Sequence, residues 1–256
     1  MKIKLFINKS VHENAAYYYE LAKECREKIK GSESAIEETK KEIEKAKKSE
    51  EKKQIRVKRD KEWYEKFNHS YTSEGKLMIG GRNAQQNDQV VSKYMEDIDL
   101  FFHADIQGGS AVILKDGANA SEQELLEVAQ FTASFSKAWI NANAAVDVYA
   151  VKKDQLSKHA QGGFIPTGAF AISGTRVWFR STKLALMIGL GEKGLMLIPQ
   201  MSKTKLKNSL VLVPSKSGKS KGSLAKSLAK RFDVHPDELL EILPNGLSKT
   251  VSLTNQ

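Results

Sequence analysis

The chain has 256 residues, enough to bury one or two cores, and its net charge of +10 at pH 7 favours a polyanionic partner. Its single cysteine, Cys25, excludes a disulfide framework and a cysteine-ligated zinc site, and fits the reducing cytosol, so we expect a cytoplasmic protein. Apolar runs such as 184–190 are far shorter than the roughly 20 residues of a membrane span, so no membrane contact is expected.

The first part of the chain has the pattern of a strand followed by a long helix. Residues 3–7 alternate apolar and polar side chains, which predicts a short strand. Ser10 and Glu13 have the spacing of a capping box, so a helix should begin there. Apolar or small residues then recur at steps of four and three, as in a coiled coil. This seam consists of Val11, Ala15, Tyr18, Ala22, Cys25, Ile29, Ser32, Ile36, Thr39, Ile43 and Ala46.

A charged run at 47–53 interrupts the seam and is a candidate hairpin tip. Residues 55–67 keep heptad spacing and could form a return leg, but this leg is shorter than the first. Part of the first helix would then lack a partner, although helices in water depend on packing. We therefore expect a long helix or hairpin that requires another helix.

Two glycine pairs organise residues 63–115. The first, Gly80-Gly81, follows an apolar run that predicts a strand, and glycine lets the backbone turn sharply or approach a ligand closely. A helix is expected from about Asn83 to Met95. Its start is crowded with hydrogen-bonding side chains, namely Arg82, Asn83, Gln85, Gln86 and Asn87. Helix N-termini attract anions and amides can read ribose hydroxyls and base edges, so the group suits RNA contact; the alternative is capping and turn chemistry.

The second pair, Gly108-Gly109, separates two further apolar runs and follows His103, Asp105 and Gln107. His103 and Asp105 could form an acid–base or metal site, as in an RNA-processing nuclease. Alternatively they form a hydrogen-bonded pair that fixes the bend. The spacing is not diagnostic, and no Ser-His-Asp or Cys-His pattern is present, so we predict no catalysis, no cofactor and no metal.

The next elements are mixed helix and strand. Ser121 and Glu124 form a second capping box, and the helix behind it should run to about Asn143. Residues 146–151 predict a buried strand. Residues 168–172 and 176–180 predict a hairpin about Ser173-Gly174.

Beyond residue 181, three short strands are expected at 184–190, 195–198 and 210–213, then helices at 223–232 and 236–243. The segment 203–231 contains nine basic residues and no acid, which predicts contact with nucleic acid, or alternatively a solubilising surface. This basic block consists of Lys203, Lys205, Lys207, Lys216, Lys219, Lys221, Lys226, Lys230 and Arg231.

Residues 210–220 mimic a phosphate-binding loop, since a strand is followed by Gly218-Lys219-Ser220. The first glycine of that motif is absent, because Val213 stands in its place. We therefore do not expect nucleotide hydrolysis.

The two glycine segments, 80–87 and 103–109, together resemble the RNA-binding (NFACT-R) domain of the NFACT family. The likeness covers roughly residues 1–180. It extends through Ser10–Ala15, Tyr17–Tyr19, Ala138-Trp139, Ser157-Lys158 and Ile165–Phe170. The resemblance implies an RNA-binding protein of ribosome-associated quality control that acts on stalled large subunits. It also implies that the family's N-terminal half, which recruits tRNA, is not in this chain, so a separately encoded N-terminal half is an expected partner.

These observations predict an α+β protein: a strand and coiled coil at 1–62, a mixed NFACT-R-like domain at 63–180, and a small basic β/α unit at 181–256. The expected function is binding of RNA, either the ribosomal large subunit or tRNA; the alternatives are the nuclease above or a coiled-coil adaptor. The predicted RNA-binding residues are Arg82, Asn83, Gln85, Gln86, Asn87, His103, Asp105, Gln107, Lys158, Lys216, Lys219 and Lys221.

Overall fold

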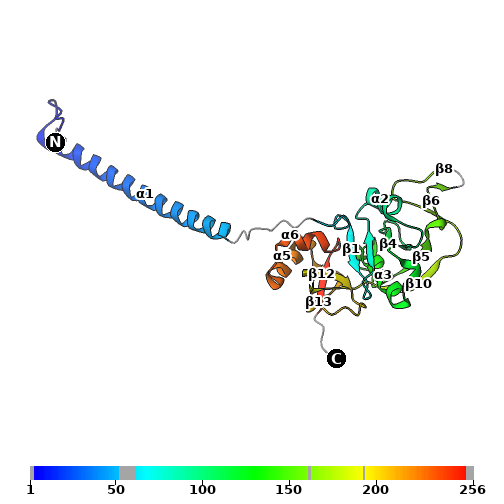
Figure 1. Ribbon diagram of the computed structural model, residues 1–256. Helices are drawn as coiled ribbons and strands as arrows, with labels where there is room; N and C mark the ends of the chain where they lie inside the picture. Colours follow the sequence, from blue (N-terminus) through cyan, green and yellow to red (C-terminus); the bar gives the residue numbers. More distant parts are fainter. Residues whose placement is uncertain (1–2, 52–60, 161–162, 193, 252–256) are drawn as a thin grey trace. The chain divides into compact units, whose positions relative to one another are not determined.

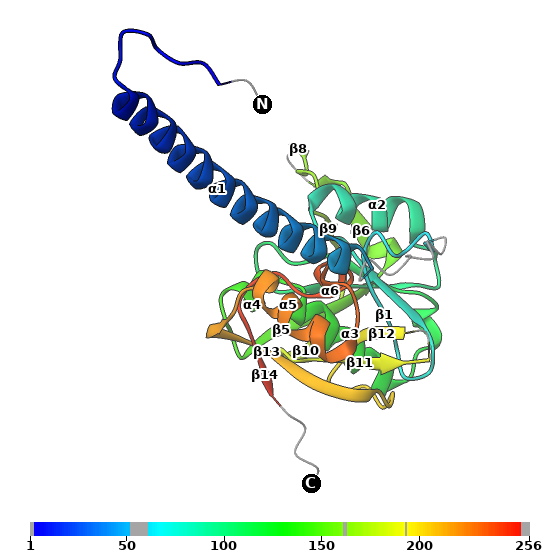
Figure 2. The ribbon, with the colours of Figure 1, turned by 90° about the vertical axis from the view of Figure 1, so that its left-hand side faces the viewer.

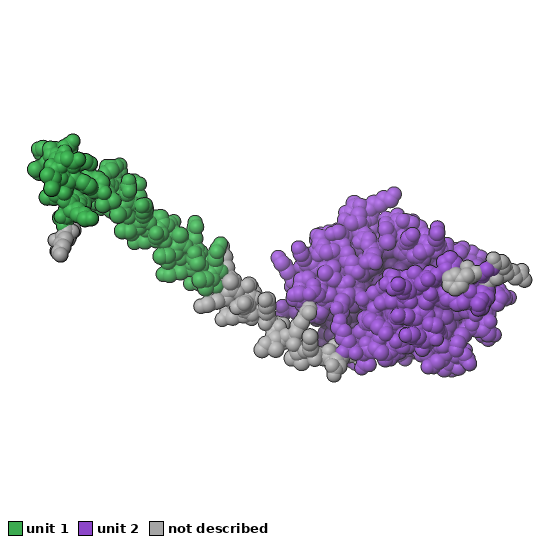
Figure 3. Space-filling model, turned by 90° about the horizontal axis from the view of Figure 1, so that it is seen from above, with its two compact units in different colours: residues 1–60 green, residues 61–256 purple. Residues whose placement is uncertain are grey.

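The computed structural model describes residues 3–51, 61–160, 163–192 and 194–251. The chain divides into two compact units, residues 1–60 and residues 61–256 (Figures 1 and 3). The first is helical, and the second combines antiparallel sheets with helices, which confirms the predicted α+β class.

The helix of the first unit, α1 (Val11–Glu51), begins at the predicted capping box. The Ser10 N–H donates to Glu13 Oε2 at 2.7 Å, and the Glu13 N–H donates to Ser10 Oγ at 3.3 Å. At about 1.5 Å per residue, α1 is roughly 60 Å long. It continues through 47–51, so that part of the expected hairpin tip is helical instead. The proposed return leg lies partly outside the described residues, and its described part, 61–67, forms turns and no helix.

The segment before α1 is not the strand that the alternation predicted. Residues 3–9 fold back against the first turn of the helix, because Asn14 supplies their hydrogen-bond partners. Its side chain accepts the Phe6 N–H at 2.8 Å and donates to the carbonyls of Phe6 and Lys9 at 3.1 and 3.2 Å. The Phe6 ring also meets Tyr17 edge-on. Local side-chain bonds therefore replace the strand partner that this segment would need.

The second unit is built on a six-stranded sheet in which all neighbouring strands are antiparallel. Its order is β1-β2-β4-β3-β5-β10 (Figure 1). The strands are β1 (Asn68–Tyr71), β2 (Leu77–Gly80), β3 (Leu100–Ala104), β4 (Val112–Leu114), β5 (Ala145–Lys152) and β10 (Val177–Lys183). The predicted strands at 77–79 and 146–151 are thus confirmed.

A second sheet, of four strands, has the order β12-β11-β13-β14 and contains the three strands expected after residue 181. Its members are β11 (Leu186–Gly191), β12 (Gly194–Pro199), β13 (Lys207–Lys219) and β14 (Ser248–Val251). The phosphate-loop mimic is extended strand as far as Lys219, and Ser220 then caps the next helix. There is accordingly no loop of the kind that wraps a phosphate.

Two short ribbons complete the strands. They pair β6 (Leu156–Ser157) with β9 (Ala171–Ile172), and β7 (His159–Ala160) with β8 (Gly163–Phe164). The expected hairpin about Ser173-Gly174 is therefore wrong: β9 pairs with β6, whereas β10 pairs with β5.

The helices of the second unit are α2 (Ala84–Tyr94), α3 (Glu122–Ser134), α4 (Lys137–Ile140), α5 (Lys221–Phe232) and α6 (Pro236–Ile242), with single turns at Gly117–Asn119 and Lys153–Gln155. α3 packs on β3, β5 and β10 and also on β11 and β12, so it lies between the two sheets (Figure 2). The predicted capping box at Ser121 is present. The helix ends at Ser134 rather than Asn143, because Ser136 caps the separate α4.

Two apolar clusters hold this unit together. One joins the α3 side of the first sheet (Phe102, Val112) to the second sheet and α5 (Leu186, Leu224). The other, around Phe101, lies beneath α2. Because the first cluster draws residues from both 63–180 and 181–256, the two segments share a core, and the division at residue 180 stays a prediction.

Candidate functional site

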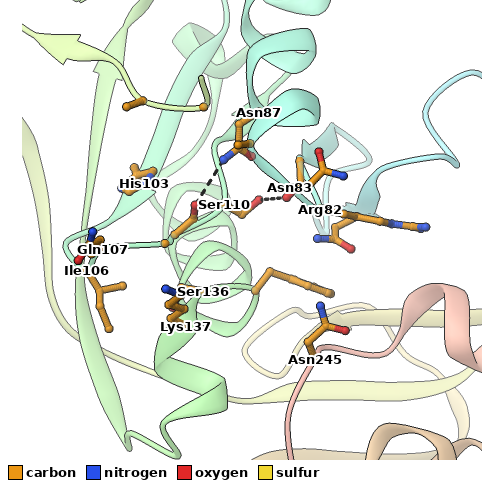
Figure 4. A pocket seen from close by; sticks show the side chains of 18 of the residues that line it. Arg82, Asn83, Asn87, His103, Ile106, Gln107, Ser110, Ser136, Lys137 and Asn245 are labelled. Carbon is orange, nitrogen blue, oxygen red and sulfur yellow. Dashed lines mark hydrogen bonds between the residues drawn. The ribbon is translucent and has the colours of Figure 1, made fainter. Parts of the chain in front are cut away.

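A pocket of about 600 Å³ brings the two glycine segments together (Figure 4). It lies between the start of α2, the bend at 106–110, the junction of α3 and α4, the loop 167–170 and the segment around Asn245. Of the predicted site residues, Arg82, Asn83, Asn87, His103 and Gln107 line it.

The glycine turns are held in direct contact with each other. The Gly81 N–H donates to the Ala111 carbonyl at 3.2 Å, and Ser110 Oγ donates to the Gly81 carbonyl at 2.7 Å. A Cβ on Gly81 would lie 2.2 Å from Oδ1 of Asn87. Glycine is required here because the backbone approaches α2 too closely for any side chain.

The amide side chains at the start of α2 form hydrogen bonds within the protein that stabilise the fold. Asn83 is the N-cap, since its Oδ1 accepts the Gln86 N–H at 2.9 Å. Gln86 in turn accepts the Arg82 N–H at 3.0 Å and donates to the Lys66 carbonyl at 3.3 Å. Asn87 is buried and bonds Ala111. These contacts are the capping and turn chemistry considered above, and RNA contact by the three amides stays a prediction. Gln85 is exposed and does not line the pocket.

The guanidinium of Arg82 also forms hydrogen bonds within the protein. One nitrogen, Nη2, donates to three backbone carbonyls, those of Phe67 (3.1 Å), Glu65 (3.3 Å) and Glu241 (3.0 Å). Arg82 thereby connects the turns before β1 to the last turn of α6. Burial lowers the pKa of the guanidinium, although the nearby Glu241 opposes that effect.

His103 and Asp105 do not form the pair that a nuclease centre would need. His103 lines the pocket, with its ring against Gly109, and burial lowers its pKa. Asp105 follows the end of β3, is exposed and does not line the pocket. No hydrogen bond between these two described side chains is present. Gln107 lines the pocket and is exposed.

Lys158 lies outside the pocket and anchors the loop that forms one wall. Its ammonium contacts Asp88, donates to the Ala169 carbonyl at 2.7 Å and lies 4.0 Å from the centre of the Phe170 ring. Asp88 also accepts the Gly168 N–H at 3.0 Å. Lys158 therefore positions pocket residues rather than facing solvent freely.

Lys221 lies beside the pocket, where it donates to Asn245 Oδ1 at 3.1 Å. Burial and the charge of Arg82 both lower its pKa.

Lys216 and Lys219 are exposed on the last part of β13, and Lys219 donates to Ser227 at 3.3 Å. Within the described ranges, no cation of the basic block forms an ion pair with a carboxylate. Among the described residues, no carboxylate at ion-pair distance therefore offsets the charge of the block.

Among the pocket residues that the sequence analysis did not predict are Ser134, Lys137 and Asn245. They come from elements distant in the chain and match no short motif. Ser134 is fully buried, and its hydroxyl has no hydrogen-bond partner among the described residues, so a polar ligand atom could supply one. Lys137 is exposed, and its side chain packs on Gly108.

The pocket is electropositive. Arg82 and Lys137 line it, Lys221 adjoins it, and no carboxylate is among its lining residues. Such a site favours an anion. Among the described residues, no group of three or more His, Cys, Asp or Glu side chains is placed to hold a metal ion. None of the described helices is both long enough and apolar enough to span a membrane.

Fold and pocket together define an α+β domain with a cationic pocket. Residues 61–174 match the family described as the NFACT protein RNA binding domain, which confirms the resemblance over that segment.

The chain is similar in sequence to longer proteins, and in part to one solved structure. The chain is 37% identical over 199 residues to the archaeal Rqc2 homolog aRqcH of Methanocaldococcus jannaschii, covering 75% of this chain and 30% of that protein. It is 36% identical over 191 residues to the ribosome quality control complex subunit NEMF homolog of Drosophila melanogaster, covering 69% of this chain and 18% of that protein. The C-terminal part of the fibronectin/fibrinogen-binding protein from Streptococcus suis is a solved structure with a TM-score of 0.40 and 24% identity; the match covers 67% of this chain and 76% of that one. This chain thus spans less than a third of either relative.

Proposed function

We propose that this protein binds RNA of the ribosomal large subunit or tRNA and acts in ribosome-associated quality control in the cytosol. The observation that carries the proposal is the un-neutralised positive charge of the pocket and the basic block. Polyanion binding by lysine and arginine is driven by release of counterions from phosphates, which requires cations that are not already paired. The RNA-binding family match and the ribosome quality control relatives point to the same partner. We propose a binding role without catalysis, since His103 has no Asp105 partner at the pocket.

The test measures how RNA affinity depends on salt. If about four to six phosphates are neutralised, log K should fall with log salt with a slope of roughly −3 to −5. Replacing Lys216, Lys219, Lys221 and Lys226 by Gln should flatten this slope. The matched control replaces four lysines of α1 by Gln, namely Lys23, Lys28, Lys30 and Lys40. It has the same net charge as the first variant and should keep the wild-type slope of log K against log salt. Equal slopes in the two variants, or a wild type that binds neither ribosomal subunits nor tRNA, would contradict the proposal.

We also propose that α1 pairs with a helix of another protein, for which a separately encoded NFACT N-terminal half is the candidate. The supporting observation is a row of seam residues, Ile29, Ile36 and Ile43, that are 56%, 54% and 49% exposed. Helices with an uncovered apolar stripe gain stability by packing it. Sedimentation of a mixture with such a half should give a complex, and replacing the three isoleucines by Ser should abolish it. If the mixture sediments as two separate species, the pairing is rejected.

A further inference from the structure

Three aromatic side chains form a row across three neighbouring strands of the six-stranded sheet. His103 on β3 is in register with Tyr149 on β5, and Tyr149 is in register with Trp178 on β10. The ring centroids are 5.9 Å apart for His103 and Tyr149, and 5.3 Å apart for Tyr149 and Trp178. Because opposite residues of paired strands point to the same face, the three rings line one face of the sheet.

Two guanidinium groups extend the row, Arg176 just before β10 and Arg180 on it. Arg176 lies 4.7 Å from the centre of the Tyr149 ring and 5.8 Å from that of Trp178. Arg180 lies 3.9 Å from the centre of Trp178. Residues 176, 178 and 180 share a face because side chains alternate along a strand. The result is a row of aromatic and guanidinium groups from the pocket, which His103 and Tyr149 line, to the edge strand of the sheet. The rings are inclined to each other by 37° and 66°, and Tyr149 is only 7% exposed, so the accessible part of the row is Trp178 with Arg176 and Arg180.

The outer end of the row is accessible and positively charged. The Arg180 side chain is 62% exposed even though it forms an ion pair with Asp147 at 2.6 Å. Arg176 is half-buried, and no carboxylate of the described residues lies within ion-pair distance of it. A half-buried guanidinium without a counter-charge is suited to a phosphate.

We propose that the outer end of this row, formed by Trp178 with Arg176 and Arg180 beside it, is a stacking platform for unpaired bases of an RNA single strand. The proposal rests on the proposed function and narrows the RNA ligand to a single strand. Bases of a single strand expose their faces and stack on aromatic rings and on arginine planes, whereas bases inside a duplex are covered by their neighbours. The strand would continue from the platform toward the cationic pocket. Arg176, Trp178 and Arg180 lie just beyond the matched segment 61–174.

The experiment measures binding of the full chain to a fluorescent 12-nucleotide oligouridine and to a 12-base-pair RNA duplex. Trp178→Ala should weaken oligouridine binding about tenfold, and Arg176→Gln should also weaken it, because stacking and phosphate contacts are lost. Trp178→Phe should stay close to the wild type, since it keeps an aromatic face. Val177→Ala is the matched control. Val177 is 59% exposed on the opposite face of β10, so its replacement should leave the affinity for oligouridine unchanged. Duplex affinity should be the same in all variants.

Photocrosslinking of the wild type keeps the test independent of variant folding. Oligouridine containing 4-thiouridine should give adducts in the peptide that contains Trp178. Adducts only elsewhere, together with unchanged oligouridine affinity in Trp178→Ala and Arg176→Gln, would overturn the platform while leaving RNA binding intact. Equal loss of duplex and oligouridine binding in those variants would overturn it as well. A wild type that binds no RNA and no ribosomal subunit would overturn the proposed function and the platform together.

Discussion

The side chain of Asn87 on α2 accepts the backbone N–H of Ala111 at 3.1 Å. It also donates to the carbonyl of Gly109 at 3.5 Å, so one buried amide joins the start of the helix to the second glycine bend. The two turns that form the pocket are therefore fixed to each other by a residue whose polar atoms are satisfied within the protein.

We expect Asn87→Ala to lower the free energy of unfolding by about 1–3 kcal/mol, because the buried Ala111 N–H loses its acceptor. Urea unfolding at neutral pH measures the change. Gln85→Ala, an exposed position on the same helix, is the control and should change it by less than about 0.5 kcal/mol. An Asn87→Ala protein as stable as the wild type would show that this amide is available for RNA after all.

Much of the local structure could be predicted because the signals lie within a few residues. The capping boxes at Ser10 and Ser121 and the cap at Asn83 all begin helices as expected. Errors arose where a distant residue supplies the partner. Residues 3–7 alternate like a strand, yet Asn14 satisfies their backbone, and Ala171–Ile172 pairs with β6 instead of its neighbour in sequence.

The candidate site was foreseen only as two separate glycine segments. The fold brings Arg82 and His103 of these segments to one pocket, and their roles as RNA ligands stay a prediction. Their hydrogen-bond partners could not be foreseen, because the carbonyls that hold Arg82 come from the turns before β1 and from α6. The row from His103 to Trp178 depends on strand register across β3, β5 and β10, which no local pattern encodes.

We expect Arg82→Ala to act mainly on stability. Three carbonyls lose their donor, so the free energy of unfolding should fall by about 1–3 kcal/mol in urea titrations. Lys137→Gln should leave stability unchanged, because Lys137 is exposed, but should reduce the slope of log K for RNA against log salt by about one if it contacts a phosphate. The reverse pattern, with affinity lost in Arg82→Ala and stability retained, would make Arg82 a direct RNA ligand.

We expect Asp99→Ala to be among the most destabilising changes in the second unit. Asp99 is fully buried, and it accepts from Lys115 Nζ at 2.7 Å and from the N–H groups of Glu96 and Asp116 at 2.7 and 2.9 Å. Its removal leaves the N–H groups of Glu96 and Asp116 without their acceptor, and leaves the largely buried Lys115 ammonium with only the exposed Glu96 as a counter-charge, at a cost of about 3–5 kcal/mol. The control is Asp97→Ala, which breaks an exposed pair with Lys153 and should cost less than about 1 kcal/mol. Thermal melting compares both, and equal melting temperatures would contradict the expectation.

The last prediction concerns pH. Burial lowers the pKa of His103 below its ordinary value of 6.5, so the unfolded chain takes up this proton before the folded protein does. The depressed pKa means that the stability contribution is complete above about pH 6.5 and is lost as pH falls toward the lowered value of the folded state. Two charges act on the ring: Asp105 raises its pKa, and Arg176 lowers it further.

Replacing His103 by Gln should remove this part of the acid destabilisation, seen as a smaller loss of unfolding free energy between pH 7.5 and pH 5. His12→Gln, at an exposed position on α1, is the control and should follow the wild-type curve. If His103→Gln loses as much stability as the wild type over that range, then His103 takes up its proton in the folded protein as readily as in the unfolded chain.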